Sequence, residues 1–150
     1  MRIIRSIEEK YSCPIAILAD LQGPKLRVGT FAEDKVLLVE GQKFRFDLDP
    51  EPGSAQRVNL PHPEIINTLE PGDRLLLDDG KLSVTVEAKG EGFVDTRVMV
   101  AGSLSNRKGV NTPTIVLPIS PMTPKDRKDL EYIVESLDVD WVALSFVQVG

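Results

Sequence analysis

The most informative stretch of the chain is Ile15-Ala-Ile-Leu-Ala-Asp-Leu-Gln-Gly-Pro-Lys-Leu-Arg27. As far as Leu21 it is a nearly continuous apolar run, which is typical of a strand that is covered on both faces. A Gly-Pro pair then breaks the strand, and two cations follow. Ahead of the strand, apolar residues near helical spacing predict a helix from Arg2 to Tyr11, which Ser12-Cys13-Pro14 ends.

From about Val28 to Leu117 the pattern changes to short apolar segments, several of them alternating at period two, between turn residues. The expected strands are 36–39, 43–46, 74–77, 82–86 and 93–100. Asp79-Gly80 between two apolar runs predicts a hairpin. Strands that are so short and so regularly spaced indicate a small barrel or sandwich.

From Pro118 onward the helical pattern returns. Thr123-Pro-Lys-Asp126 predicts a helix start, with a threonine N-cap, a proline at the first position and an acid at the third. Trp141 to Val147 predicts another apolar strand. Strand, helix and strand make a βαβ unit of a parallel sheet. The β-rich zone therefore lies in a βα loop, where α/β folds place their ligand sites, and it is well placed to act as a lid.

Composition excludes several classes of protein. The chain has 150 residues, 41% of them hydrophobic, and a net charge of −5, which suits one ordinary globular domain. Weak acidity argues against nucleic acid and anionic membranes as partners. A single cysteine cannot form an internal disulfide, and a single histidine excludes a multi-His metal site. Since no membrane helix or signal-peptide core is visible, we expect a cytoplasmic protein.

Two polar stretches carry candidate binding residues. In the first, Asp20 suits a cation or a basic partner, and Lys25 and Arg27 suit phosphate. A domain hinge with solvated charges explains these residues equally well. The second stretch, Gly102 to Pro113, is expected to be a polar loop in which Arg107-Lys108 offers charge to an anion. Its glycine spacing is not that of a P-loop, and a basic surface turn is the simpler interpretation.

Other residues have simple structural interpretations. Asp78-Asp79-Gly80-Lys81 is better explained by a hairpin turn than by a metal-binding carboxylate pair. His62 lies in a loop with no evident partner, so an inert role is expected. Cys13 is expected to be a packed thiol. Trp141 and Phe146, on the last strand, are expected in the core.

Five stretches in one order carry a family resemblance. They are Ala19-Asp-Leu-Gln-Gly-Pro-Lys-Leu-Arg27, Leu77-Asp-Asp-Gly80, Gly102 to Pro113, Met122-Thr-Pro-Lys-Asp-Arg-Lys-Asp-Leu130 and Val139-Asp-Trp-Val-Ala-Leu-Ser-Phe-Val147. In combination they resemble pyruvate kinase over nearly the whole chain. Members of that family have a catalytic (β/α)₈ barrel with a β-rich lid inserted after one barrel strand.

The resemblance implies a mainly β chain, with a small β-barrel domain inserted in a fragment of a (β/α)₈ barrel. We expect partial catalytic barrel segments at 1–27 and 119–150 and the β-barrel lid at 28–118. A complete barrel takes about 250 residues. The family's catalytic lysine and its Mg²⁺-binding Glu and Asp are expected beyond Gly150, so the chain holds no main catalytic residue. We therefore expect a fragment that is inactive alone.

The implied activity is glycolytic transfer of the phosphoryl group of phosphoenolpyruvate to ADP, giving pyruvate and ATP, with Mg²⁺. Arg27 and Lys108 match residues that contact the nucleotide phosphates. Asp20 matches an acid of the monovalent-cation site. Leu21 stands where a threonine usually lends its carbonyl to that ion.

Lys25 departs from a common family pattern, Asp-Thr-Lys-Gly-Pro-Glu before the arginine. It replaces the glutamate, and Gln22 replaces the lysine. In the family, lysine at this place is associated with independence from K⁺. An ammonium group supplies the positive charge that the ion otherwise provides, so we expect that K⁺ is not required.

Two further hypotheses remain open. The chain is alternatively a self-sufficient β-barrel ligand-binding module, or a structural or regulatory fragment that binds a full-length enzyme. Against nucleic acid, residues 28–118 hold 10 Lys and Arg against 14 Asp and Glu, a net charge of −4. For the full enzyme we expect ADP, ATP and phosphoenolpyruvate as ligands and a homotetramer. For the isolated fragment we expect dimers through exposed strands.

Overall fold

The computed structural model describes residues 1–113 and 115–147. The chain forms two compact units. The β unit is Lys25–Pro118, and the flanking unit combines Met1–Pro24 with the described residues from Ile119 onward. The first predicted boundary, after residue 27, lies slightly later than this division. Residues 148–150 of the predicted last segment lie outside the described residues.

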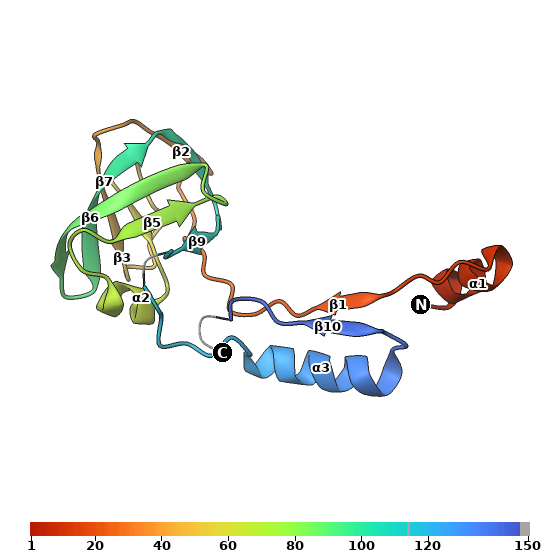
Figure 1. The fold of residues 1–150 in the computed structure, drawn as a ribbon. Helices are drawn as coiled ribbons and strands as arrows, with labels where there is room; N and C mark the ends of the chain where they lie inside the picture. The colour runs from red at the N-terminus through yellow and green to blue at the C-terminus, as the bar shows by residue number, and fades with distance from the viewer. Residues whose placement is uncertain (114, 148–150) are drawn as a thin grey trace. The chain divides into compact units, whose positions relative to one another are not determined.

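The flanking unit has the predicted order of strand, insertion, helix and strand. Its elements are α1 (Arg2–Tyr11), β1 (Leu18–Asp20), α3 (Pro124–Ser136) and β10 (Trp141–Ala143). β1 and β10 pair in parallel, with Leu18 opposite Trp141 and Asp20 opposite Ala143. Figure 1 shows the two strands side by side. The βαβ unit and the helix over Arg2–Tyr11 are therefore confirmed.

Both strands are shorter and less covered than predicted. Leu18 is 59% exposed and Trp141 is 65% exposed, because β1 and β10 form a two-stranded sheet with no further strand among the described residues. The expectation that Trp141 and Phe146 belong to a core is therefore wrong for this chain. Cys13 is also exposed rather than packed, since it follows the left-handed residue Ser12 that ends α1.

Arg5 fastens α1 to the strand segments of the flanking unit. Its guanidinium donates to Glu8 and Asp138, at 2.8 Å each, and to Asp140 at 3.1 Å. Asp140 also accepts the backbone N–H of Ile17 at 2.7 Å. These carboxylates raise the pKa of Arg5 above its usual range. One cation thus joins the helix, the residues before β1 and the residues before β10.

The start of α3 forms the predicted capping box. Thr123 Oγ1 accepts the N–H of Asp126 at 3.2 Å, and the Asp126 carboxylate accepts the N–H of Thr123 at 2.8 Å. Asp126 is completely buried and also accepts the backbone N–H of Gly23 at 3.1 Å. The cap therefore connects the helix to the residues that follow β1.

The β unit is built on a six-stranded sheet of order β4-β3-β7-β6-β5-β9 and a two-stranded sheet, β2-β8. Its elements are β2 (Lys35–Leu38), β3 (Lys43–Asp47), β4 (Arg57–Asn59), α2 (Pro63–Thr68), β5 (Arg74–Leu77), β6 (Leu82–Gly90), β7 (Phe93–Val100), β8 (Gly102–Ser105) and β9 (Val110–Asn111). Figure 1 shows these strands curving around a shared interior. Fully buried side chains fill it, among them Leu38, Phe44, Phe46, Val58, Leu60, Ile65, Leu75, Leu77, Val84, Val94 and Leu104. The small β-barrel domain is confirmed.

Two local predictions had different outcomes. The Asp79-Gly80 hairpin is confirmed, since β5 and β6 pair antiparallel with Leu77 opposite Leu82. The prediction of a polar loop from Gly102 to Pro113 is wrong, because β8 and β9 occupy half of this stretch. Leu104 and Val110 are buried and bring this stretch into the sheets.

Among the described residues, no helix is long and apolar enough to cross a membrane.

Replacing Thr123 with alanine removes the side-chain half of the capping box. We expect Thr123→Ala to destabilise the start of α3 by about 1 kcal/mol, which is the usual effect of losing an N-cap hydroxyl. Amide hydrogen exchange in the first turn of α3 should accelerate accordingly. Thr123→Ser keeps the hydroxyl and should exchange like the original chain; equal acceleration in both variants would contradict the assignment.

Candidate functional site

Arg27 and Lys108 are brought together by a short antiparallel pairing inside the β unit. The N–H of Val28 donates to the carbonyl of Lys108 at 3.0 Å, and the N–H of Val110 donates to the carbonyl of Leu26 at 2.9 Å. Arg27 is the middle residue of its segment, and its side chain is exposed. Two candidate residues that lie far apart in the sequence therefore share one end of the β unit.

Lys108 is held by a carboxylate of the β5–β6 turn. Lys108 Nζ lies 2.9 Å from Asp78 Oδ1, and Lys81 Nζ lies 3.0 Å from the other oxygen. The Asp78 side chain is 13% exposed. The two lysines, Lys108 more than Lys81, hold the pKa of Asp78 below its usual value. The carboxylate is therefore ionised and keeps Lys108 oriented without any bound ligand.

The backbone of the same turn supports this arrangement. Asp78 and Asp79 both have positive φ, 49° and 58°, as the hairpin turns that match strand twist require. The Asp78 N–H donates to the carbonyl of Gly109 at 3.1 Å, next to Lys108. The predicted hairpin turn is confirmed. The sequence did not reveal that its first aspartate also bonds the segment that carries Lys108.

His62 has partners that sequence reasoning missed. Its Nε2 atom accepts the backbone N–H of Arg27 at 3.1 Å, and its Nδ1 atom lies 3.3 Å from Glu64 Oε1. The expectation of a histidine without a partner is therefore wrong. No sequence signal pointed to this contact, because His62 and Arg27 meet only once the β unit has folded.

The remaining candidate residues are distributed over both units. Asp20 ends β1 in the flanking unit, where it accepts the hydroxyl of Ser145 at 3.2 Å. Leu21 is buried, and its N–H donates to the carbonyl of Ala143 at 3.0 Å. Lys25 is an exposed residue of the β unit, and within the described part of the chain it makes no hydrogen bond or ion pair.

The described residues do not form a Mg²⁺ site. Among them, no group of three or more His, Cys, Asp or Glu side chains is placed to hold a metal ion. The oxygens of Asp78 are already paired with two ammonium groups. A divalent cation prefers several oxygen ligands and is repelled by such neighbours. No step that depends on Mg²⁺ can be assigned to these residues.

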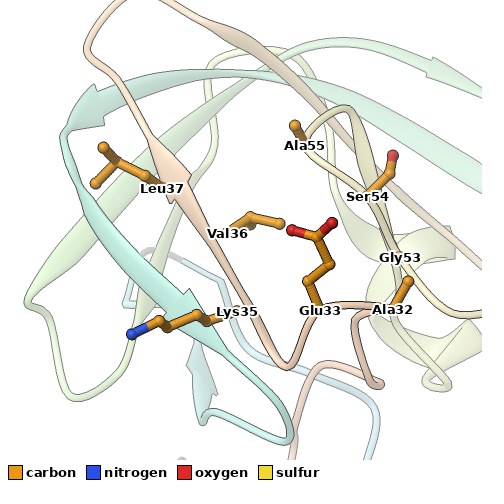
Figure 2. A pocket seen from close by; sticks show the side chains of 8 residues that line it. All are labelled: Ala32, Glu33, Lys35, Val36, Leu37, Gly53, Ser54 and Ala55. Carbon is orange, nitrogen blue, oxygen red and sulfur yellow. The ribbon is translucent and has the colours of Figure 1, made fainter.

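A separate cavity of about 370 Å³ lies between β2 and the segment Gly53–Ala55. Figure 2 shows Val36 and the carboxylate of Glu33 directed into it, while Lys35 and Leu37 project to the other side of the strand. Its lining is mainly apolar, and its only charged members are one acid, Glu33, and one base, Lys35, so it lacks the cluster of cations that would suit phosphate. The cationic end of the unit is the better candidate for binding a nucleotide.

Comparison with known proteins identifies the family. The family model for the pyruvate kinase barrel domain matches residues 1–150. The chain belongs to the pyruvate kinase family. It is 53% identical to a pyruvate kinase of Methylorubrum extorquens over 148 residues, and 51% identical to one of Agrobacterium vitis. Each alignment covers nearly all of this chain, 99% and 98%, but 31% of the relative.

A solved structure shows the same fold. The crystal structure of a pyruvate kinase from Cryptosporidium parvum matches with a TM-score of 0.87 and 26% identity, over 97% of this chain and 30% of that one. The predicted family and the predicted fold class, a small β-barrel domain inserted in part of a (β/α)₈ barrel, are confirmed. The chain spans about 30% of the length of the relatives that it matches.

The Asp78 contacts predict an order of effects on its titration. Replacing Lys108 with methionine removes the stronger of two ion pairs, so the pKa of Asp78 should rise. Lys81→Met is the matched control and should raise the pKa less. Carboxyl carbon chemical shifts followed against pH measure both. A larger rise in Lys81→Met would show that Lys108 is not the main partner.

Proposed function

We propose that the protein containing this chain transfers the phosphoryl group of phosphoenolpyruvate to ADP, and that this chain supplies part of the nucleotide site. Membership of the pyruvate kinase family supports the reaction. The observation that carries the role of this chain is the pairing that places Arg27 beside the segment of Lys108, with Asp78 orienting the lysine.

These residues suit the demands of phosphoryl transfer. The reaction depends on positioning and on neutralising phosphate charge more than on covalent catalysis. A guanidinium binds phosphate oxygens in a planar two-pronged geometry, whereas an ammonium acts as a compact charge. Arg27 fixes the orientation of the nucleotide phosphates. Lys108 moves from Asp78 toward them, so that phosphate replaces the carboxylate as its partner.

Mg²⁺ is part of the proposal, with its protein ligands supplied by residues that this chain does not carry. When bound, the ion neutralises charge on the phosphates. Asp20 and the Leu21 carbonyl are proposed for the monovalent-cation site, and the ammonium of Lys25 replaces K⁺ there. Isolated, the chain lacks the main catalytic residues and is inactive.

The proposed partners follow from the family and from the exposed strands. The whole enzyme binds phosphoenolpyruvate and ADP or ATP, is a homotetramer and is cytoplasmic. In the isolated chain the apolar side chains of β1 and β10 are exposed, with Val142 at 37% and Leu18 at 59%. Exposed strands of this kind invite pairing with a second chain, so dimers are expected.

Titration of the isotopically labelled chain with ADP and Mg²⁺ tests the nucleotide site. Chemical shift changes should centre on Arg27 and Lys108, and Arg27→Met should weaken binding by about tenfold or more, since charge-assisted hydrogen bonds contribute about 1.5–3 kcal/mol. Glu33→Gln, in the separate cavity, is the matched control and should bind normally.

A parallel titration with single-stranded DNA separates this proposal from a β-barrel binding module. Shifts that spread over a face of the β unit with DNA, and none with ADP, would favour the module and contradict the nucleotide site. Weak acidity of the β unit favours the opposite result.

The role of Lys25 predicts kinetics that do not depend on K⁺. The longer enzyme should show the same kcat and KM for phosphoenolpyruvate with and without KCl, in buffer free of Na⁺ and K⁺. Lys25→Glu removes the ammonium group and adds a carboxylate, so it should create activation by KCl. Strong activation of the unaltered enzyme would contradict the proposal, and Lys35→Glu serves as a control for the change of net charge.

A further inference from the structure

The backbone N–H of Arg27 points to the side opposite its strand partner. The neighbouring residues, Val28 and Leu26, make the two hydrogen bonds to the segment Lys108–Val110. In an antiparallel pair the residue between two such bonds directs its own N–H and C=O away from the partner strand. The N–H of Arg27 therefore points outward, where a third strand would normally lie.

His62 takes the place of that missing strand. Its Nε2 atom accepts the Arg27 N–H at 3.1 Å. The ring is fixed by its position as the residue before α2 and by Glu64 Oε1, 3.3 Å from Nδ1. The His62 side chain is 18% exposed, so protein atoms cover most of the ring. Nε2 accepts a hydrogen bond, so in the neutral ring it carries no hydrogen. The ring hydrogen is therefore on Nδ1, which donates to Glu64.

We propose that His62 is a positioning residue for Arg27, and that nucleotide binding at Arg27 requires the neutral form of this histidine. The inference rests on the proposed contact of Arg27 with the nucleotide phosphates. His62 itself touches no ligand. It acts by fixing the backbone from which the guanidinium extends, between the Lys108 segment on one side and the imidazole on the other.

Protonation of His62 reverses the contact. Histidine changes charge between pH 5 and pH 8, and the charged ring carries a hydrogen on both nitrogens. The Glu64 carboxylate lies beside Nδ1, and the backbone N–H of Arg27 lies beside Nε2. Glu64 holds the charged ring as well as the neutral one, so Nε2–H is left facing the Arg27 N–H. Two donors then oppose each other, and the Arg27 segment loses its support as the pH falls.

Nuclear magnetic resonance of the full 150-residue chain tests the geometry without any ligand. The ring nitrogen shifts should show hydrogen on Nδ1 of neutral His62. The amide signal of Arg27 should titrate with the same midpoint as the ring. In His62→Gln, whose side-chain oxygen accepts a hydrogen bond but does not titrate, the Arg27 amide should be independent of pH between 5 and 8.

ADP affinity, measured with Mg²⁺ from pH 8 to pH 5.5, tests the consequence. The phosphates of ADP titrate in the same range, so the informative quantity is the ratio of dissociation constants between the original chain and His62→Gln at each pH. The ratio should be near one at pH 8 and rise to about fivefold at pH 5.5, the effect of one lost hydrogen bond. His62→Ala should bind weakly at every pH, and Glu33→Gln should follow the original chain.

Three outcomes would overturn the proposal. If the Arg27 amide does not follow the ring of His62, the contact does not position Arg27, whatever ADP does. If the amide follows the ring but the ratio stays constant, His62 supports the backbone without affecting the nucleotide site, and the proposed function survives. If ADP binds to none of the variants, the proposed function fails, and the role of His62 in nucleotide binding fails with it.

Discussion

The buried carboxylate of Asp126 connects the segment just before the β unit to the segment just after it. It accepts the N–H of Gly23, just before the β unit begins, and the N–H and hydroxyl of Thr123, just after the β unit ends. Gly23 and Asp126 are 103 residues apart in sequence. The Thr123 hydroxyl is the main cause of the lowered pKa of this carboxyl. An ionised carboxylate without exposure to water is tolerable only with several donors, and here the donors come from both ends of the insertion.

The same contact explains the glycine of the Gly-Pro pair. Gly23 has φ of 64°, and a Cβ atom there would approach Phe146 Cδ2 to 2.9 Å and the carbonyl of Ser145 to 3.2 Å. A side chain would therefore be strained twice, by the backbone conformation and by contact with the residues after β10. Glycine lets the chain pass close to this segment while its N–H reaches Asp126. The turn that starts the insertion is set by packing in the flanking unit.

Local elements were predictable from the sequence, and partners distant in sequence were not. The capping box at Thr123 and the hairpin at Asp79-Gly80 depend on residues a few positions apart, so their spacing was sufficient. β8 and β9 were missed because their stretch is rich in polar and turn residues. They are strands because Leu104 and Val110 enter the core and because β2 and β5 offer free edges.

The candidate site shows the same division. Family resemblance named Arg27 and Lys108, but the contacts that orient them, His62 and Asp78, follow from topology. The contacts of Arg5 with Asp138 and Asp140 were invisible for the same reason. Trp141 was expected to be buried because an apolar sequence predicts burial, but the sequence does not identify the segment that would cover the side chain.

Pairing Lys108 with Asp78 also has a physical advantage for a site that binds anions. A lysine that is free in solution loses about 2 kcal/mol of side-chain entropy when it is ordered, and an isolated positive cluster repels itself. Here Asp78 orders Lys108 beforehand and is itself held by the turn and by Lys81. In the proposed nucleotide site, a phosphate would replace the carboxylate as the anion beside an ammonium that is already oriented. The side-chain entropy of Lys108 is then lost during folding and not during binding. The binding free energy depends on how much more favourably the ammonium interacts with phosphate than with the carboxylate.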